Sequence, residues 1–195
     1  MKKTFVSMLG FVFILSACNN TNETTENSTN SSASSNTATD ANTNTSNNSV
    51  VTDEKSKEFL TKVANSGMAE VQMAKDAQQK ATIDAVKSFA AMLERDHTAV
   101  GDQVKSYASQ RNVSLPTSPS DDKQKMINDM NKMSGKAFDK DFIDMMVKNH
   151  NDGIKLFEDT KANASDVDIK NFADKTLPTL KMHLDSAKAI QKRYW

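Results

Sequence analysis

Three histidines and one glutamate are the residues of this chain whose types and spacing could do chemistry together. His97, His150 and His183 are the only histidines among the 195 residues. Each falls on the apolar stripe of a segment with helical periodicity, and Glu70 has an equivalent place on an earlier segment. Neutral imidazole and carboxylate are ligands for divalent first-row metals, and facing helices of a bundle can converge on such ions. The four residues are therefore a candidate metal site, and a purely structural role for buried histidines stays open.

Glu94 is an additional candidate ligand. It precedes His97 by three residues, which is the Glu-x-x-His spacing of di-iron bundles. The second copy of this motif is absent, because Leu180 occupies the position three residues before His183. The sequence therefore argues against a complete di-iron oxidase centre. It leaves the ion open between iron, manganese, zinc and copper.

Three aspartates near the histidines could orient the imidazole rings or simply face solvent: Asp96, Asp144 and Asp152. The side chain of Asp96 points about 100° away from that of His97 around a helix. We therefore expect a surface or capping role for Asp96. We expect the other two aspartates to be solvated.

Four long helices must position these residues. Hydrophobic periodicity predicts helices at about 53–80, 82–112, 136–161 and 166–190, with Thr52 as the N-cap of the first. No run of alternating apolar and polar residues predicts a strand. The C-terminal pair Tyr194 and Trp195 is expected to pack on the end of the bundle.

One long connection, residues 112–135, separates the second predicted long helix from the third. Prolines mark its beginning, and from Ser120 it contains a short amphipathic helix whose Met126, Met130 and Met133 are expected to cover the core. Short turns join the other helices. We therefore expect an all-α, ferritin-like four-helix bundle, in which a single long crossover follows the second helix. Counting residues from the helix starts places the candidate ligands at similar depths.

The N-terminal 50 residues have a different composition. Residues 1–17 combine two lysines, an apolar run and small residues, as in a secretory signal peptide. The run ends in Leu-Ser-Ala-Cys, which resembles the bacterial lipobox, so Cys18 is the expected lipidation site. Residues 18–50 are rich in Asn, Ser and Thr and are expected to form a disordered tether. We expect residues 51–195 to fold, and the protein to be anchored to a membrane of the bacterial cell envelope, with the outer membrane or a periplasmic orientation favoured.

Composition excludes some functions. The 25 basic and 25 acidic residues are interspersed, without a basic block, so nucleic-acid binding is not expected. No nucleophile elbow, glycine-rich phosphate loop or Cys-x-x-Cys motif is present. The sequence identifies no protein partner and favours a protein without enzymatic activity.

Several of these residues occur in an order that resembles a known family. The motifs are Glu70 with Ala74, Asp96-His97, Ser134-Gly135, Phe138-Asp139, His150, Leu177-Pro178-Thr179-Leu180 and His183. Together they resemble the bacterial family known as domain of unknown function 4142, over roughly Glu54 to Ile190. The resemblance implies a ferritin-like bundle in the outer membrane or envelope, without an assigned activity.

Three hypotheses follow. The first is a lipid-anchored envelope bundle that holds a metal ion through Glu70, His97, His150 and His183. The second is a metal-dependent oxidoreductase that handles oxygen or peroxide at the same residues. The third is a periplasmic copper-binding protein that uses histidine and methionine.

Overall fold

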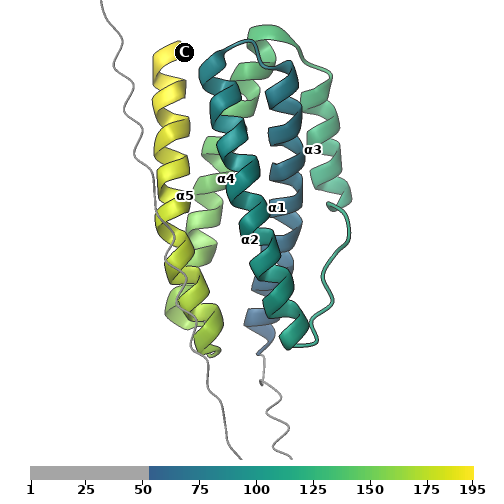
Figure 1. Cartoon of the computed structure of the whole chain (residues 1–195), viewed down its shortest axis with the longest axis vertical. Coiled ribbons are helices and arrows are strands. Elements are labelled where there is room, and N and C mark those ends of the chain that lie inside the picture. Colours follow the sequence, from purple (N-terminus) through teal and green to yellow (C-terminus); the bar gives the residue numbers. More distant parts are fainter. Residues whose placement is uncertain (1–52) are drawn as a thin grey trace, which may run out of the picture. The chain divides into compact units, whose positions relative to one another are not determined.

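The computed structural model describes residues 53–195, which form a helical bundle (Figure 1). Its helices are α1 (Glu54–Lys80), α2 (Asp84–Gln110), α3 (Asp121–Asn131), α4 (Gly135–Asn163) and α5 (Val167–Tyr194). No strand occurs within this range, so the all-α prediction is confirmed. None of these helices is both long and apolar enough to cross a bilayer. The predicted signal peptide, Cys18 and the tether lie outside the described residues.

The four long helices form two antiparallel hairpins, α1 with α2 and α4 with α5 (Figure 1). The connection that contains α3 leads from the end of α2 back along the outside of the bundle to the start of α4. As a result α2 and α4 run in one direction, and α1 and α5 run in the other. This is the connectivity predicted from the loop lengths. A ferritin relationship as such stays a prediction.

Two of the helix starts are capped by their own N-terminal aspartates. Asp53, rather than the predicted Thr52, is the N-cap of α1, and its Oδ1 accepts a hydrogen bond from the Ser56 amide at 2.7 Å. Thr52 itself lies just outside the described residues. Asp166 caps α5 by accepting from the amides of Asp168 and Ile169. Each cap satisfies amide groups that the first helical turn leaves free.

The start of α2 is capped from another helix. Its N-cap residue, Ile83, makes no side-chain cap. Instead the fully buried Asp139 of α4 accepts hydrogen bonds from the Thr82 amide, the Thr82 hydroxyl and the Ile83 amide. One carboxylate thus ties the α1 to α2 turn to α4, which gives a physical role to the Phe138-Asp139 motif.

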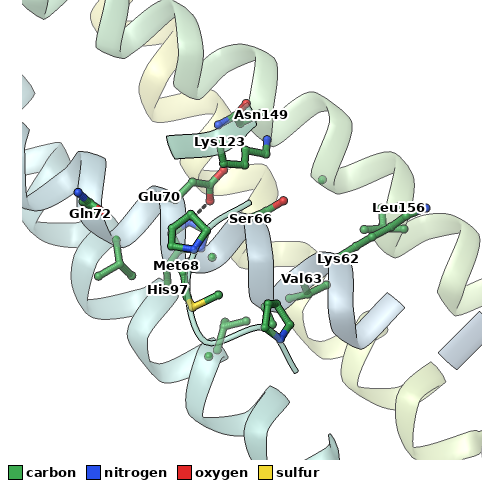
Figure 2. Close-up of a pocket in the computed structure, with 18 of the residues that line it drawn as sticks. Lys62, Val63, Ser66, Met68, Glu70, Gln72, His97, Lys123, Asn149 and Leu156 are labelled. Atoms are coloured by element: carbon green, nitrogen blue, oxygen red, sulfur yellow. Dashed lines mark ion pairs between the residues drawn. The ribbon is translucent and has the colours of Figure 1, made fainter. Parts of the chain in front are cut away.

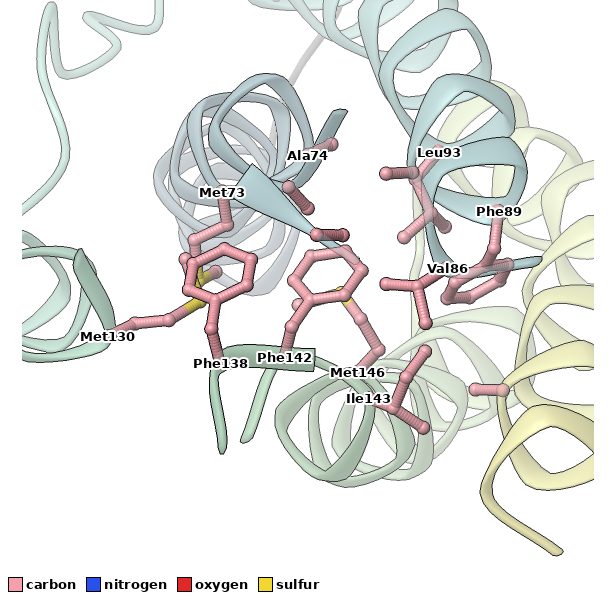
Figure 3. Packing of buried hydrophobic residues seen from close by; sticks show 14 of the residues in the cluster. Met73, Ala74, Val86, Phe89, Leu93, Met130, Phe138, Phe142, Ile143 and Met146 are labelled. Carbon is pink, nitrogen blue, oxygen red and sulfur yellow. The ribbon is translucent and has the colours of Figure 1, made fainter. Parts of the chain in front are cut away.

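The apolar core consists of two clusters with a polar layer between them. The first cluster includes Met73, Leu93, Phe142 and Met146, with other residues shown in Figure 3. The second lies toward the opposite end of the bundle and includes Phe59, Val104, Phe157 and Phe172. On α2 and α4 the candidate ligand lies between the residues of the two clusters, and on α1 Glu70 directly follows Ala69 of the first cluster.

Some expectations about the bundle surface need correction. Met130 of α3 is buried and Met133, just after α3, packs against the core, as predicted, but Met126 of α3 is only partly buried. Ile127, one residue later, is fully buried in its place. Tyr194 and Trp195 do not pack on the bundle end: they are 39% and 41% exposed and contact each other. Tyr194 is the last residue of α5, and Trp195 follows it as the C-cap.

Candidate metal centre

The structure brings the three histidines together in the polar layer. The ring centroids of His97 on α2, His150 on α4 and His183 on α5 are 5.2 to 5.5 Å apart. One ligand nitrogen of each lies within 4.8 Å of those of the other two, and all three residues are buried. Counting residues from the helix starts predicts similar depths for these histidines. The structure agrees with this prediction, because it brings together one histidine from each of three helices.

Glu70 of α1 joins the cluster on the side of His97. Its Oε2 lies 3.2 Å from Nε2 of His97, and both side chains are nearly buried. Although the two atoms are close, Nε2 of His97 has no hydrogen-bond partner with acceptable geometry. A buried polar atom without a partner is costly, unless an ion or another ligand satisfies it.

The outer hydrogen bonds of His150 and His183 determine where their protons lie. Nδ1 of His150 is 2.9 Å from the Met146 carbonyl oxygen, and Nε2 of His183 is 3.0 Å from Oδ2 of Asp96. Carbonyl and carboxylate oxygens only accept, so both ring nitrogens donate. The other nitrogens, Nε2 of His150 and Nδ1 of His183, face each other at 3.3 Å. In the neutral rings both of these nitrogens carry lone pairs and no proton lies between them.

Burial keeps these two rings neutral. It lowers the pKa of His150, an effect only partly offset by the charge of Glu70. It also lowers the pKa of His183 to about 4, despite the hydrogen bond to Asp96. A proton shared between the rings is therefore disfavoured at neutral pH. A cation placed between the facing lone pairs removes their repulsion.

The residues present fit a transition-metal ion. When two nitrogens bind the same tetrahedral ion at about 2.1 Å each, they lie about 3.4 Å from each other. The distance between Nε2 of His150 and Nδ1 of His183 is 3.3 Å, which is close to this value. Three imidazole nitrogens are suitable donors for zinc, iron, manganese or copper, and the Glu70 carboxylate lies beside His97. The second nitrogen of His150 and of His183 is held by a hydrogen bond, as metal-bound imidazoles usually are.

Asp96 has a role that the sequence analysis did not favour. We expected it on the surface, but it accepts the hydrogen bond from His183 and its side chain is only 19% exposed. The Asp96 carboxylate reaches His183 of α5, so its side of α2 faces another helix rather than solvent. The hydrogen bond from Arg95 lowers the pKa of Asp96, so it remains an ionised acceptor.

The remaining acidic candidates lie away from the cluster. Glu94 binds the side chains of Gln78 and Lys75 on α1, and the structure does not bring it to the three histidines. Asp152 pairs with Lys148 on the exposed face of α4, as expected for a solvated residue. Asp144 pairs with Lys140, but it is partly buried and also accepts a hydrogen bond from Gln191 of α5 at 2.7 Å, so it is less solvated than expected.

A cavity of about 920 Å³ leads to this centre. Glu70, His97 and His150 contribute to its wall, and Figure 2 shows Glu70 and His97 within it. Exposed residues such as Lys62 and Lys105 also line it, so it opens to solvent. A space open to solvent therefore extends to the wall formed by these three residues. Nothing in the sequence indicated this cavity.

The lowered histidine pKa values predict an acid-sensitive metal-free bundle. Unfolded histidine titrates near 6.5, whereas folded His183 titrates near 4. Between these values the unfolded chain binds a proton that the folded chain does not, so stability falls as the pH falls from 6.5 toward 4. The expected slope is about 1.4 kcal/mol per pH unit for such a group. Urea unfolding of chelator-treated protein at pH 6.5, 5.8 and 5.0 measures it. His183→Gln should flatten the slope, and equal slopes for the two proteins would contradict the prediction.

The fold and the site together define a four-helix protein with three buried histidines that could hold a metal ion, and with Glu70 beside one of them. The chain belongs to the family described as domain of unknown function DUF4142, whose model matches residues 37–190. The match confirms the resemblance seen in the sequence, but it begins inside the segment that we assigned to the tether. No curated protein matches the chain.

A solved structure supports the fold. The chain resembles a DUF305 fragment from Deinococcus radiodurans, with a TM-score of 0.65 and 10% sequence identity. The similarity covers 73% of this chain and 98% of that one. At this identity the similarity concerns the fold alone.

Proposed function

We propose that the bundle binds one divalent first-row transition-metal ion through His97, His150, His183 and Glu70. The observation that carries the proposal is the pair of imidazole lone pairs facing each other at 3.3 Å, with both outer nitrogens already donating. The unpartnered Nε2 of His97 beside the Glu70 carboxylate supports it. Such an arrangement is unfavourable when empty and favourable around a cation.

Metal binding by the purified full chain tests the proposal. After treatment with a chelator, the protein is titrated calorimetrically with Zn²⁺, Mn²⁺, Fe²⁺ and Cu²⁺, and the bound metal is counted by elemental analysis. We expect about one ion per chain. An ion at about 1,000 times its Kd should stabilise the fold by about 4 kcal/mol. Failure of every ion to bind or to raise the Tm would leave a structural bundle.

A metal-dependent oxidoreductase is the second candidate, and the cavity is the observation that favours it. Three of the four proposed ligands line a space that opens to solvent, so a coordination position on the ion is accessible. Iron- or manganese-bound protein should then consume peroxide or oxygen. Bound metal without such turnover counts against the enzyme. Copper is included among the ions tested for binding, because Met68 and Met126 also line the cavity and thioether sulfur binds Cu(I).

We also propose that the bundle is held at the bacterial cell envelope by a lipid on Cys18. The support is the sequence itself: a charged start, an apolar run and the Leu-Ser-Ala-Cys segment that contains the only cysteine. The Asn/Ser/Thr-rich segment 18–50 would then separate bundle and membrane. Cell fractionation of Cys18→Ser tests this, because the variant should leave the membrane fraction while the unmodified protein stays there.

A further inference from the structure

The cavity beside the metal centre has three helix glycines in its wall. Gly67 of α1, Gly101 of α2 and Gly153 of α4 all line it. A Cβ atom added at any of them would meet no atom within 4 Å. Glycine weakens a helix relative to alanine, and neither close packing nor a positive φ requires it at these positions. The absence of side chains here keeps the space open.

The wall of the cavity has an apolar part and a polar end. The apolar part comes from α1, α2, α4 and the connection after α2, and includes Val63, Val100, Leu115, Leu156 and Phe157. The polar end holds Nε2 of His97, which is buried and has no hydrogen-bond partner. An occupant that suits both parts has an apolar body and one group that can bind near His97.

The side chains around the cavity carry both signs of charge, and a bound metal ion would favour an anionic group. Four lysines that line it pair with acidic side chains: Lys62, Lys75, Lys105 and Lys148. Four acidic side chains also line it: Glu70, Asp102, Asp122 and Asp152. Lys123 of α3 also lines the cavity and forms no ion pair within residues 53–195, and it is among the lining residues labelled in Figure 2. A divalent ion at the cluster would add positive charge at the polar end. Oxygen anions are ligands that such ions accept.

We infer that the cavity receives an organic carboxylate with an apolar body, whose carboxylate oxygen binds the metal ion beside His97. The inference rests on the proposed metal site and names the class of ligand that it takes. Natural pockets for small organic ligands measure about 300 to 1,000 Å³, and this cavity falls within that range at about 920 Å³. Filling its apolar part supplies the affinity, and the metal fixes the orientation.

A chain-length series tests the inference on the full chain. Zinc content is first measured by elemental analysis, and zinc-bound protein is then titrated calorimetrically with acetate, butyrate, hexanoate and octanoate. We expect the Kd to fall by up to about fourfold per added methylene group. Octanol, which lacks the carboxylate, and octanoate with zinc-free protein should each bind at least about tenfold more weakly than octanoate with zinc-bound protein.

Two variants fill the cavity. Gly101→Leu and Gly153→Leu should each weaken octanoate binding at least about tenfold, while zinc content and acetate binding stay unchanged. Ala189→Leu, on an exposed position of α5 outside the cavity, is the matched control and should bind octanoate normally. If the leucine variants do not fold, the chain-length series on the unmodified protein still decides.

The outcomes separate the two proposals. Zinc binding without carboxylate binding, or carboxylate binding that does not depend on chain length or zinc, overturns this inference and leaves the metal site intact. A complete failure to bind metal overturns both. Tenfold weaker binding in Ala189→Leu would show that the leucine effect does not report on the cavity, and it would also overturn the inference.

Discussion

Replacing His150 with alanine (His150→Ala) is expected to weaken metal binding by more than about 100-fold. His150 contributes one of the two facing lone pairs, and its Nδ1 is already fixed by the Met146 carbonyl. Loss of an outer hydrogen-bonding partner alone typically costs 10- to 100-fold in metal affinity. Loss of a direct ligand should cost more. Calorimetric titration of the variant with the best-binding ion measures the effect.

Two glutamate variants give a matched control for this experiment. Glu70→Gln removes the carboxylate beside His97 and should also weaken binding strongly. Glu94→Gln changes an acid that follows the Glu-x-x-His spacing but binds Gln78 and Lys75 instead, so metal affinity should not change. Equal losses in the two variants would contradict the assignment of the ligands. A His150→Ala protein that binds metal normally would remove His150 from the site.

Replacing Arg111 with methionine (Arg111→Met) is expected to destabilise the fold by about 3–5 kcal/mol. Arg111 is the C-cap of α2, and its fully buried guanidinium donates from Nε to Asp166 Oδ2 at 2.6 Å and from Nη2 to Asp166 Oδ1 at 2.9 Å. The hydrogen bond from Arg111 lowers the pKa of Asp166, so the carboxylate is ionised. Removing one partner of a buried ion pair leaves the other charge uncompensated, which costs about this much.

Urea unfolding with a constant m-value measures the change in the free energy of unfolding. Arg193→Met, at an exposed position near the end of α5, is the control and should change stability by less than about 0.5 kcal/mol. An equally small effect for Arg111→Met would show that the pair between α2 and the start of α5 is not needed to hold the two hairpins together.

The sequence determined the helices and the composition of the polar layer. Hydrophobic periodicity indicated four long helices within one or two residues of their observed ends, except near the C-terminus. Connection lengths indicated which helices run in parallel. The inward positions of His97, His150 and His183 followed from the same stripes. These features are local, because helical geometry fixes the face on which a residue lies.

Only the tertiary structure decided what each side chain contacts. Asp96 accepts a hydrogen bond from His183, which lies 87 residues away in the chain. Asp139 caps the start of α2 by accepting from Ile83, which lies 56 residues away. Arg111 and Asp166, 55 residues apart in the chain, also form an ion pair, and glycines on three helices line one cavity. These contacts depend on how each helix is rotated and shifted against its neighbours. Interlocking side chains from distant segments set that arrangement, and no periodicity within one segment encodes it.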